Sequence, residues 1–230
     1  MRRMTDIIKG ICSMATRQVL AELVALYAQS TGITVTFESV GGVDAALRVQ
    51  AGEAFDVAVL GADALDKLIA SGRVLGRVNL VHSGVAVAVR VGSVRPDIST
   101  EEAVRQAVLA APSISYSTGP SGVALGKLFE RWGIGDVIKS RIVVPPPGMP
   151  VGTLLARGEV ALGFQQLSEL MHGKGIDVVG TLPESIQITT TFSGGVCATS
   201  TQPDAVFRLL EFLSSPAAQE AKRRHGMHPA

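Results

Sequence analysis

The sequence predicts an α/β protein made of two lobes, each built around a mostly parallel sheet. Short apolar runs alternate with stretches whose apolar residues recur at helical spacing, the pattern of strand–helix–strand units. Apolar residues make up 47% and charged residues 18% of the 230, which is typical of a compact fold. Two apolar runs, Val81–Val91 and Ile186–Ala198, exceed the usual strand length of roughly five to six residues. We expect them to carry the chain into a second lobe and back.

The segment before the first long run predicts three strands and three helices. Its clearest helix covers residues 15–29, because Val19, Leu20 and Leu23 lie on one face at i, i+1 and i+4. Glycines such as Gly32 and Gly72 end the helices. The expected strands are 7–11, 33–37 and 55–60, and the expected helices are 15–29, 43–51 and 63–70.

The central segment repeats the alternation, and two helices that start at Pro203 and Pro216 finish the chain. The expected central helices are 100–110, 121–132, 150–157 and 167–172, and the expected strands are 114–116, 141–144, 160–165 and 177–179. Lobe I is therefore expected at 1–82 plus 193–230, and lobe II at 83–192. A ligand cleft between two lobes can open and close around a solute.

Charge and leader patterns exclude several classes of partner. Lys and Arg total 21 and Asp and Glu total 20, so the basic excess of a nucleic-acid-binding surface is missing. No run approaches the ~20 apolar residues of a membrane span. The apolar start at Ile7-Ile8 is cut by Lys9, which is unlike a secretory signal. We expect a cytoplasmic chain, or a periplasmic one if a leader had been removed.

Three kinds of chemical site are poorly supported by the motifs. Gly122–Lys127 resembles a phosphate-binding loop but is one residue short and is followed by Leu128. His225 and His228 lack further metal ligands nearby in sequence. We therefore expect neither a cofactor nor a metal. Cys12-Ser13, at a strand end before a helix, leaves covalent catalysis open, although a small buried cysteine explains it more simply.

Small polar residues recur where a predicted strand ends and a helix begins. They occur at Ser13, at Ser39–Gly42, at Ser117–Gly122 and at Gly148-Met149. In open α/β sheets, ligands bind outside the carboxyl ends of the strands, where helix-start amides favour anions. Helix capping explains any one of these residues, but their repetition in both lobes predicts an anion site.

The order of several short motifs resembles the periplasmic molybdate-binding proteins of ATP-driven importers, within the type II periplasmic binding fold. The motifs are Cys12-Ser13, Gln50–Glu53, Pro120–Gly122, Arg157–Glu159 and Arg224–Pro229, and the likeness covers nearly the whole chain. The resemblance implies two α/β lobes joined by two crossover strands. It also implies that neutral hydroxyl and amide donors from both lobes hold an oxyanion.

Carried over by position, the resemblance implies a set of ligand-binding residues. The set is Ser13, Ser39, Gly41, Gly42, Ser121, Gly122, Gly148, Met149 and Gln166, with Gln165 beside it. Gln166 stands where the family has a tyrosine, and the turn at residues 39–42 is longer by two residues. Both differences favour a larger ligand with planar ends, and Arg17 could bind one of its carboxylates bidentately.

Other motifs look closer to a branch of this fold that resembles aconitate isomerase. These are Gly92-Ser93, Pro96–Ser99 and Leu182-Pro183 before Gln187. The first interpretation is a protein that binds a small anion, whether carboxylate, sulfate or molybdate, with an importer permease as partner only if the chain is exported. The alternative is a cofactor-free isomerase of a small tricarboxylic acid. A ligand-sensing role also stays open. Glu38 and His82 are candidate bases, but the sequence does not place them.

Overall fold

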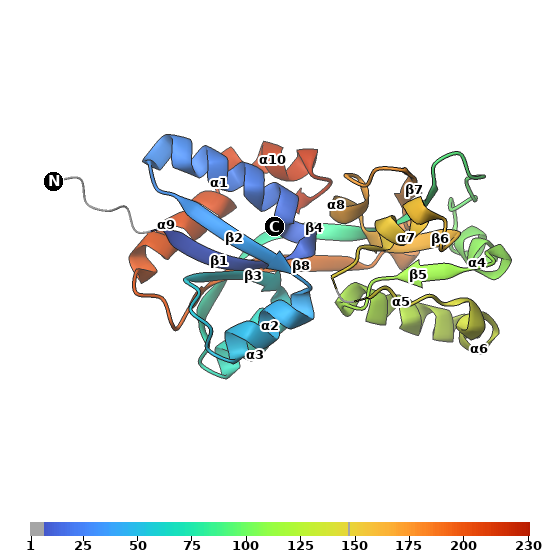
Figure 1. The fold of residues 1–230 in the computed structure, drawn as a ribbon, viewed down its shortest axis with the longest axis horizontal. Helices are drawn as coiled ribbons and strands as arrows, with labels where there is room; N and C mark the ends of the chain where they lie inside the picture. Colours follow the sequence, from blue (N-terminus) through green and yellow to red (C-terminus); the bar gives the residue numbers. More distant parts are fainter. Residues whose placement is uncertain (1–6, 147) are drawn as a thin grey trace. The chain divides into compact units, whose positions relative to one another are not determined.

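The computed structural model describes residues 7–146 and 148–230. The chain divides into two compact units, unit 1 with Met1–His82 and Thr191–Ala230, and unit 2 with Ser83–Thr190. The long strands β4 (Val74–Arg90) and β8 (Thr189–Cys197) contain the two points at which the chain passes from one unit to the other (Figure 1).

Unit 1 contains a sheet in the order β2-β1-β3-β8-β4. Strand β1 (Ile8–Ser13) lies between β2 (Val35–Val40) and β3 (Val57–Gly61) and is parallel to both. Strand β3 pairs antiparallel with β8, and the short β9 (His228–Pro229) pairs with β4. The carboxyl ends of β1, β2 and β3 therefore meet at one edge of this sheet.

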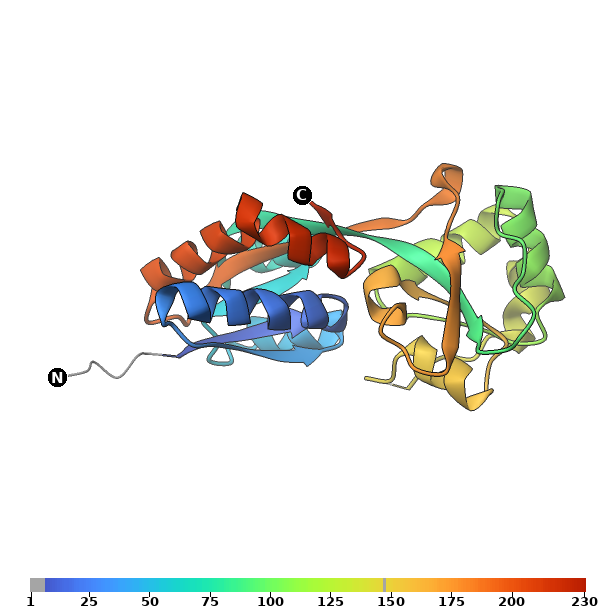
Figure 2. The same ribbon diagram turned by 90° about the horizontal axis from the view of Figure 1, so that it is seen from above.

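Helices cover both faces of the unit 1 sheet (Figure 1), and one of these faces is turned toward the viewer in Figure 2. On one face lie α1 (Arg17–Thr31), α9 (Pro203–Ser214) and α10 (Gln219–Arg224), and on the other α2 (Gly42–Gln50) and α3 (Ala62–Ala70). Successive side chains of a strand point to opposite faces. In β3, Val57 and Val59 accordingly pack with α1 and α9, whereas Ala58 and Leu60 pack with α2 and α3. Single 3₁₀ turns precede α1 (Met14–Thr16) and α10 (Pro216–Ala218).

Unit 2 repeats this plan with a smaller sheet. Strands β5 (Ile114–Tyr116) and β6 (Leu162–Gln166) are parallel, and β4 is antiparallel to β6 and to β7 (Ile176–Thr181). Helices α4 (Glu101–Ala110), α5 (Pro120–Arg131) and α6 (Gly135–Ile138) cover one face, and α7 (Val151–Arg157) and α8 (Leu167–Leu170) the other. Two 3₁₀ turns, Lys139–Arg141 and Glu184–Ile186, complete the unit.

The part of the long strand β4 that lies in unit 2 is apolar at successive positions because both of its faces are buried. In unit 2, its Val85 and Val87 pack with α4 and α5, whereas Ala86 and Ala88 pack with α7. A strand covered on both faces is apolar at every position rather than at alternate ones. The apolar pattern, which predicted a strand from Val81, did not show that β4 begins at Val74, because the first residues after Val74 are mostly exposed.

The predicted strand at 141–144 is wrong. Residues Lys139–Arg141 form a 3₁₀ turn, and Ile142 makes only an isolated parallel bridge to Ile114. The prolines that begin at Pro145 lack N–H donors and cannot extend a ladder of hydrogen bonds. The apolar residues here therefore pack at the edge of the sheet without forming a strand.

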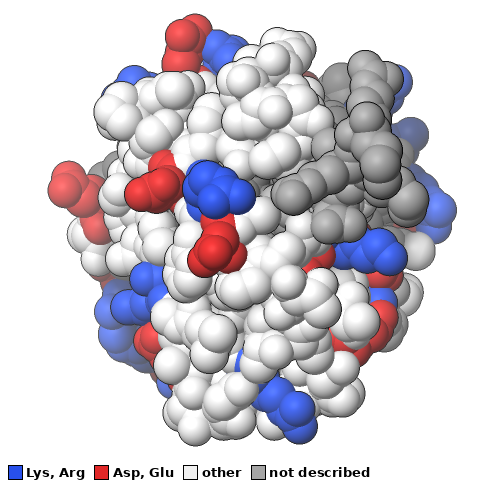
Figure 3. All heavy atoms as spheres, turned by 90° about the vertical axis from the view of Figure 1, so that its left-hand side faces the viewer, with Lys and Arg blue, Asp and Glu red and all other residues white. Residues whose placement is uncertain are grey.

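The surface agrees with the balanced charge of the sequence. Figure 3 shows one face on which acidic and basic side chains are interspersed among uncharged atoms. Within residues 7–146 and 148–230, no helix is both long enough and apolar enough to cross a bilayer. The part of that face drawn in Figure 3 in blue, red and white shows no large patch of a single charge sign.

Candidate functional site

Unit 1 brings Ser13 and the start of α2 together at the edge of its sheet. The register pairs Ser13 with Val40, so the turn after β2 lies beside the end of β1. A Cβ atom on Gly42 would lie 3.5 Å from Ser13 Oγ. That hydroxyl makes no hydrogen bond within the described part of the chain, although Ser13 O accepts one from Thr16 Oγ1 (3.0 Å).

The start of α2 supplies backbone donors to the same place. Ala45 is the first residue of this helix whose amide bonds back, to Gly41 O (2.9 Å). The amides of Gly42, Val43 and Asp44 precede it and are left without intrahelical acceptors. We call Ser13, Arg17, Ser39, Gly41 and Gly42 the Ser13 half-site. It can hold one anionic group with an unpartnered hydroxyl and helix-start amides.

Arg17 and Ser39 adjoin this half-site in different ways. Arg17 is the first residue of α1, is exposed, and forms no ion pair with a described carboxylate. Ser39 Oγ is buried, and the group nearby on which its hydroxyl acts is the weakly hydrogen-bonding thiol of Cys12. Gly41 lies next to the Asp44 carboxylate, since a Cβ atom there would be 3.2 Å from Asp44 Oδ2. Arg17 is therefore the basic side chain of the half-site that is free to bind a carboxylate.

Cys12 is a poor nucleophile in this structure. Burial raises the pKa of its thiol to about 11, although the Ser39 and Thr16 hydroxyls and the charge of Arg17 act in the opposite direction. A thiol with such a pKa is almost fully protonated at neutral pH. Cys12 and Cys197 are both buried and both free. The simpler interpretation of Cys12, a small buried side chain, is therefore favoured over covalent catalysis.

In unit 2, the start of α5 follows the end of β5. Ser117 and Ser121 share a hydrogen bond between their hydroxyls (3.0 Å). Pro120 has no N–H, and the first amide of α5 that donates a hydrogen bond within the helix is that of Val123, to Gly119 O (3.1 Å). The amides of Ser121 and Gly122 are therefore available to a ligand. Only glycine fits at position 122, because a Cβ atom would lie 1.6 Å from Ser117 O. We call Ser121, Gly122, Gly148, Met149, Gln165 and Gln166 the Ser121 half-site.

Among the other residues of the Ser121 half-site, Met149 and Gln165 already form hydrogen bonds within unit 2. Gly148 is exposed with φ +75°, and the Met149 amide already donates to Pro146 O (3.0 Å). Both ends of the buried Gln165 amide are used: Oε1 accepts from Val151 N (3.0 Å) and Nε2 donates to Glu169 Oε2 (2.7 Å). These bonds favour a positioning role for Gln165 over direct contact with a ligand.

Gln166 is buried at the boundary of unit 2. The orientation that satisfies both ends of its amide places the nitrogen 2.8 Å from Ser83 Oγ and 3.0 Å from Ser83 O. Its oxygen then accepts from Thr190 Oγ1 (2.9 Å). Gln166 therefore joins the first and last residues of unit 2, and its contact with a ligand stays a prediction.

The structure adds a titratable residue that the sequence analysis missed. Glu169, in α8, is partly buried, and burial raises the pKa of its carboxyl to about 7 against the opposing effect of the Gln165 hydrogen bond. Through Gln165 it is linked to Val151 at the start of α7, next to Met149. A carboxylate with this pKa can both accept and return a proton near neutral pH. The i, i+4 spacing of Gln165 and Glu169 was visible in the sequence, but the burial was not.

The two bases considered from sequence are less suitable. Arg48 binds both carboxylate oxygens of Glu38, at 2.5 and 2.9 Å, and holds the pKa of this exposed carboxyl below its usual range. His82 Nδ1 lies 2.9 Å from Thr191 Oγ1. Neither side chain is linked by a described hydrogen bond to a half-site residue.

Comparison with known proteins gives the family. The model of the bacterial extracellular solute-binding protein family matches residues 8–228. The chain belongs to this family. A Pseudomonas protein named aconitate isomerase is 39% identical over 220 residues, which is 91% of this chain and 83% of the relative.

Solved structures of solute-binding proteins share the fold. The periplasmic molybdate-binding protein of Azotobacter vinelandii matches with a TM-score of 0.79 at 18% identity, over 96% of this chain and 98% of that one. The sulfate-binding protein of Mycobacterium tuberculosis matches with a TM-score of 0.78 at 16% identity, over 97% and 87% of the two chains. The predicted α/β fold of the type II periplasmic binding proteins is confirmed.

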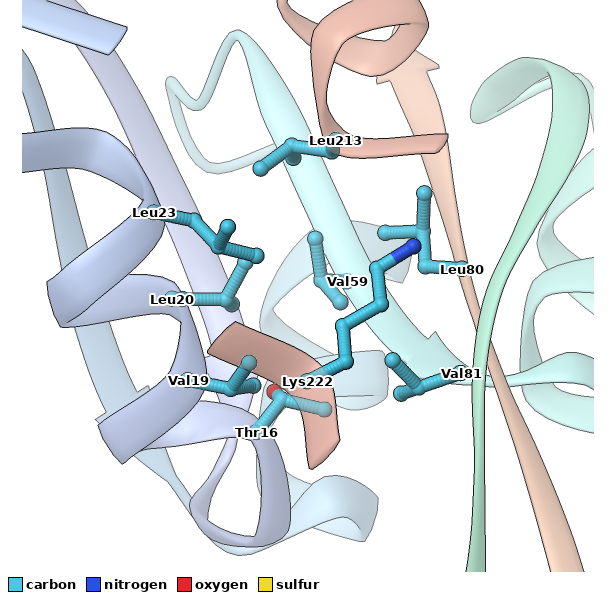
Figure 4. A pocket seen from close by; sticks show the side chains of 9 residues that line it. All are labelled: Thr16, Val19, Leu20, Leu23, Val59, Leu80, Val81, Leu213 and Lys222. Atoms are coloured by element: carbon cyan, nitrogen blue, oxygen red, sulfur yellow. The ribbon is translucent and has the colours of Figure 1, made fainter. Parts of the chain in front are cut away.

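One cavity of this solute-binding family member is too small for a solute. It lies in the core of unit 1, holds about 10 Å³, roughly a single water molecule, and is lined mostly by apolar side chains (Figure 4). Lys222 reaches into it from α10, and burial lowers the pKa of its ammonium group. Among the described residues, no group of three or more His, Cys, Asp or Glu is placed to hold a metal ion.

Proposed function

We propose that the chain is a cofactor-free isomerase that moves a double bond in a small tricarboxylic acid of the aconitate type. The observation that carries this proposal is the 39% identity to an aconitate isomerase over 91% of the chain. Anion binding, the first interpretation of the sequence, agrees with the names of the molybdate-binding and sulfate-binding structural relatives. The identity favours the enzymatic alternative, because it is more than twice that to the molybdate-binding and sulfate-binding structures.

The chemistry requires one proton carrier and donors for carboxylates. A base removes a proton from the methylene carbon beside the double bond, the double bond shifts by one carbon, and a proton returns at the far end of the three-carbon unit. The number of atoms and electrons in the acid is unchanged. Negative charge builds up on a carboxylate in the intermediate, so preformed N–H and O–H donors stabilise it.

Each unit by itself offers groups of the kinds that this chemistry requires. The Ser13 half-site has an unpartnered hydroxyl, free α2 amides and Arg17, which suits a carboxylate better than a compact tetrahedral ion. The Ser121 half-site has a hydroxyl pair and two free amides. Glu169 is the candidate proton carrier, since its raised pKa of about 7 matches the task.

Deuterium incorporation tests the reaction directly. Purified protein in D₂O is mixed with trans-aconitate, and the products are followed by proton NMR. We expect cis-aconitate that carries deuterium at the carbon receiving the returning proton, and no reaction with boiled protein. Complete recovery of unlabelled trans-aconitate would refute the isomerase proposal.

Binding without turnover is the second candidate function, supported by the oxyanion-binding names of the structural relatives. A thermal-shift panel separates the two. A ligand at a hundredfold excess over Kd stabilises a protein by about 2.7 kcal/mol. For an isomerase we expect aconitate to raise the melting temperature more than molybdate or sulfate at equal concentration. Stabilisation by molybdate alone would favour the oxyanion binder.

A further inference from the structure

Unit 2 contains an open groove beside the start of α5. Its volume is about 340 Å³, and it is lined by the end of β5, one side of α5 and the edge segment that holds Ile142 and Val144. Small-molecule sites of proteins are usually about 300–1,000 Å³. Since it shares Ser117 and Gly122 with the start of α5, the groove is continuous with the Ser121 half-site. We call it the Tyr116 groove.

The groove offers hydroxyl donors without a charged side chain in its lining. The Tyr116 hydroxyl has no hydrogen-bond partner in the part of the chain that the structure describes, and Tyr116 is half-buried. Burial and the nearby charge of Glu130 raise the pKa of Tyr116, so its hydroxyl keeps its proton as a donor. Thr118, which is exposed, adds a second hydroxyl.

Gly126 is the unusual residue of the lining. It lies in the middle of α5, where glycine costs about 1 kcal/mol of helix stability relative to alanine. The nearest atom that a Cβ would meet is the Tyr116 hydroxyl, at 4.0 Å, so packing does not require glycine. Gly122 differs, because a Cβ there would collide with Ser117 O. The effect of Gly126 is to leave the space above Tyr116 open.

We propose that the Tyr116 groove binds the –CH₂–COO⁻ arm of a tricarboxylate, with the Tyr116 and Thr118 hydroxyls donating to the carboxylate. Val123 and Val144, both largely exposed, line the groove and suit the methylene carbon. The proposal rests on the proposed function and adds a determinant of ligand size. Compact oxyanions have no such arm and leave the groove empty.

Two ligands that differ only in this arm provide the test. The trans isomer of aconitate carries the arm, whereas mesaconate, which has the same double-bond geometry, has a methyl group in its place. Calorimetry with the full chain should give at least tenfold tighter binding of aconitate. Gly126→Leu fills the groove and should reduce aconitate affinity to that of mesaconate while leaving mesaconate affinity unchanged. Tyr116→Phe removes one donor and should weaken aconitate alone, by roughly tenfold to a hundredfold.

The controls separate failure of this proposal from failure of the proposed function. Gly135→Ala, at the first residue of α6 and outside the groove, should change neither affinity, because its Cβ would make only an ordinary contact (3.7 Å). If Gly126→Leu fails to fold, Gly126→Ala and Tyr116→Phe carry the test. Turnover of aconitate by all these variants with unchanged affinity would overturn the groove proposal and leave the isomerase intact. Binding of neither carboxylate by the unmodified protein would overturn both.

Discussion

In the Ser13 half-site the key donors have no partner, whereas in the Ser121 half-site most side chains are already bonded within unit 2. Ser13 Oγ and the first α2 amides are free, but Ser121 shares a hydrogen bond with Ser117, and Gln165 uses both ends of its amide. Free donors can reorient around a ligand. Bonded ones are held in place and lose less entropy on binding.

The half-sites also differ in their titratable groups. Next to Ser13 in the sequence, the thiol of Cys12 has a raised pKa and therefore keeps its proton near neutral pH. Beside Gln165, Glu169 has a pKa of about 7. We propose charge recognition for the Ser13 half-site and proton transfer for Glu169, which is hydrogen-bonded to Gln165. The variants below test this division.

Glu169→Gln should have the largest effect on turnover. Loss of a general base typically costs 10²–10⁴-fold in rate, and the residual activity of the variant should lose its dependence on pH near 7. In the unmodified protein, the rate should rise as pH increases through about 7, because only the carboxylate accepts a proton. Aconitate isomerisation measured from pH 5 to 9 checks both points. An unchanged profile in the variant would assign proton transfer to another group.

The same variant should gain stability. Because the folded-state pKa of Glu169 is raised from 4.5 to about 7, the folded protein binds more protons than the unfolded chain between these values. Stability therefore falls as pH rises through this window. We expect Glu169→Gln to raise the free energy of unfolding by about 2 kcal/mol at pH 8 and by much less at pH 4.5, measured by urea denaturation. Equal gains at both pH values would contradict a raised pKa.

Alanine at the two helix-start glycines should affect the half-sites unequally. Gly122→Ala drives a Cβ into Ser117 O and should cost about 3 kcal/mol of stability. Gly42→Ala places its Cβ at 3.5 Å from Ser13 Oγ and should leave the melting temperature almost unchanged while weakening ligand binding. Calorimetric melting of both variants measures the difference. Equal melting temperatures would show that the Ser121 half-site accommodates an added Cβ atom as readily as the Ser13 half-site does.

Removing one hydroxyl from each half-site compares their donors. Ser13→Ala should weaken aconitate binding by roughly tenfold to a hundredfold, since a hydrogen bond to a charged group is worth about 1.5–3 kcal/mol. Ser121→Ala should cost only several-fold, because Ser117 Oγ, 3.0 Å from Ser121 Oγ, remains as a donor. Isothermal titration with the two variants decides the order. The reverse order would place the stronger contact in unit 2.

Lys222→Met should have the smallest effect on binding. The buried ammonium is unfavourable below its lowered pKa, so its replacement should stabilise the protein at pH 7. This gain should shrink as pH approaches 10.5, where the amine is neutral in the folded state already. Affinity for aconitate should not change. A loss of affinity would link the core of unit 1 to its half-site.

Local patterns predicted most helices and strands, because each has one or two continuous apolar faces. The pattern failed at residues 141–144, where apolar side chains pack without a ladder, and before Val81, where β4 is exposed. Strand-end residues such as Ser13 could be predicted as donors from their position alone. The hydrogen bonds of the Gln165 and Gln166 side chains could not be predicted, since their partners, such as Val151 and Thr190, lie elsewhere in the sequence.

The two units differ in how they can be assembled during synthesis. Unit 2 is one continuous segment, so all of its residues are synthesised before residue 191 is made. The sheet of unit 1 is incomplete until β8 pairs with β3 and β9 reaches β4, which are contacts between the beginning and the end of the chain. Such distant contacts form late, after a large loop has closed. Chains that are truncated before β8 and released from the ribosome should therefore protect unit 2 from proteases while unit 1 is still open to cleavage.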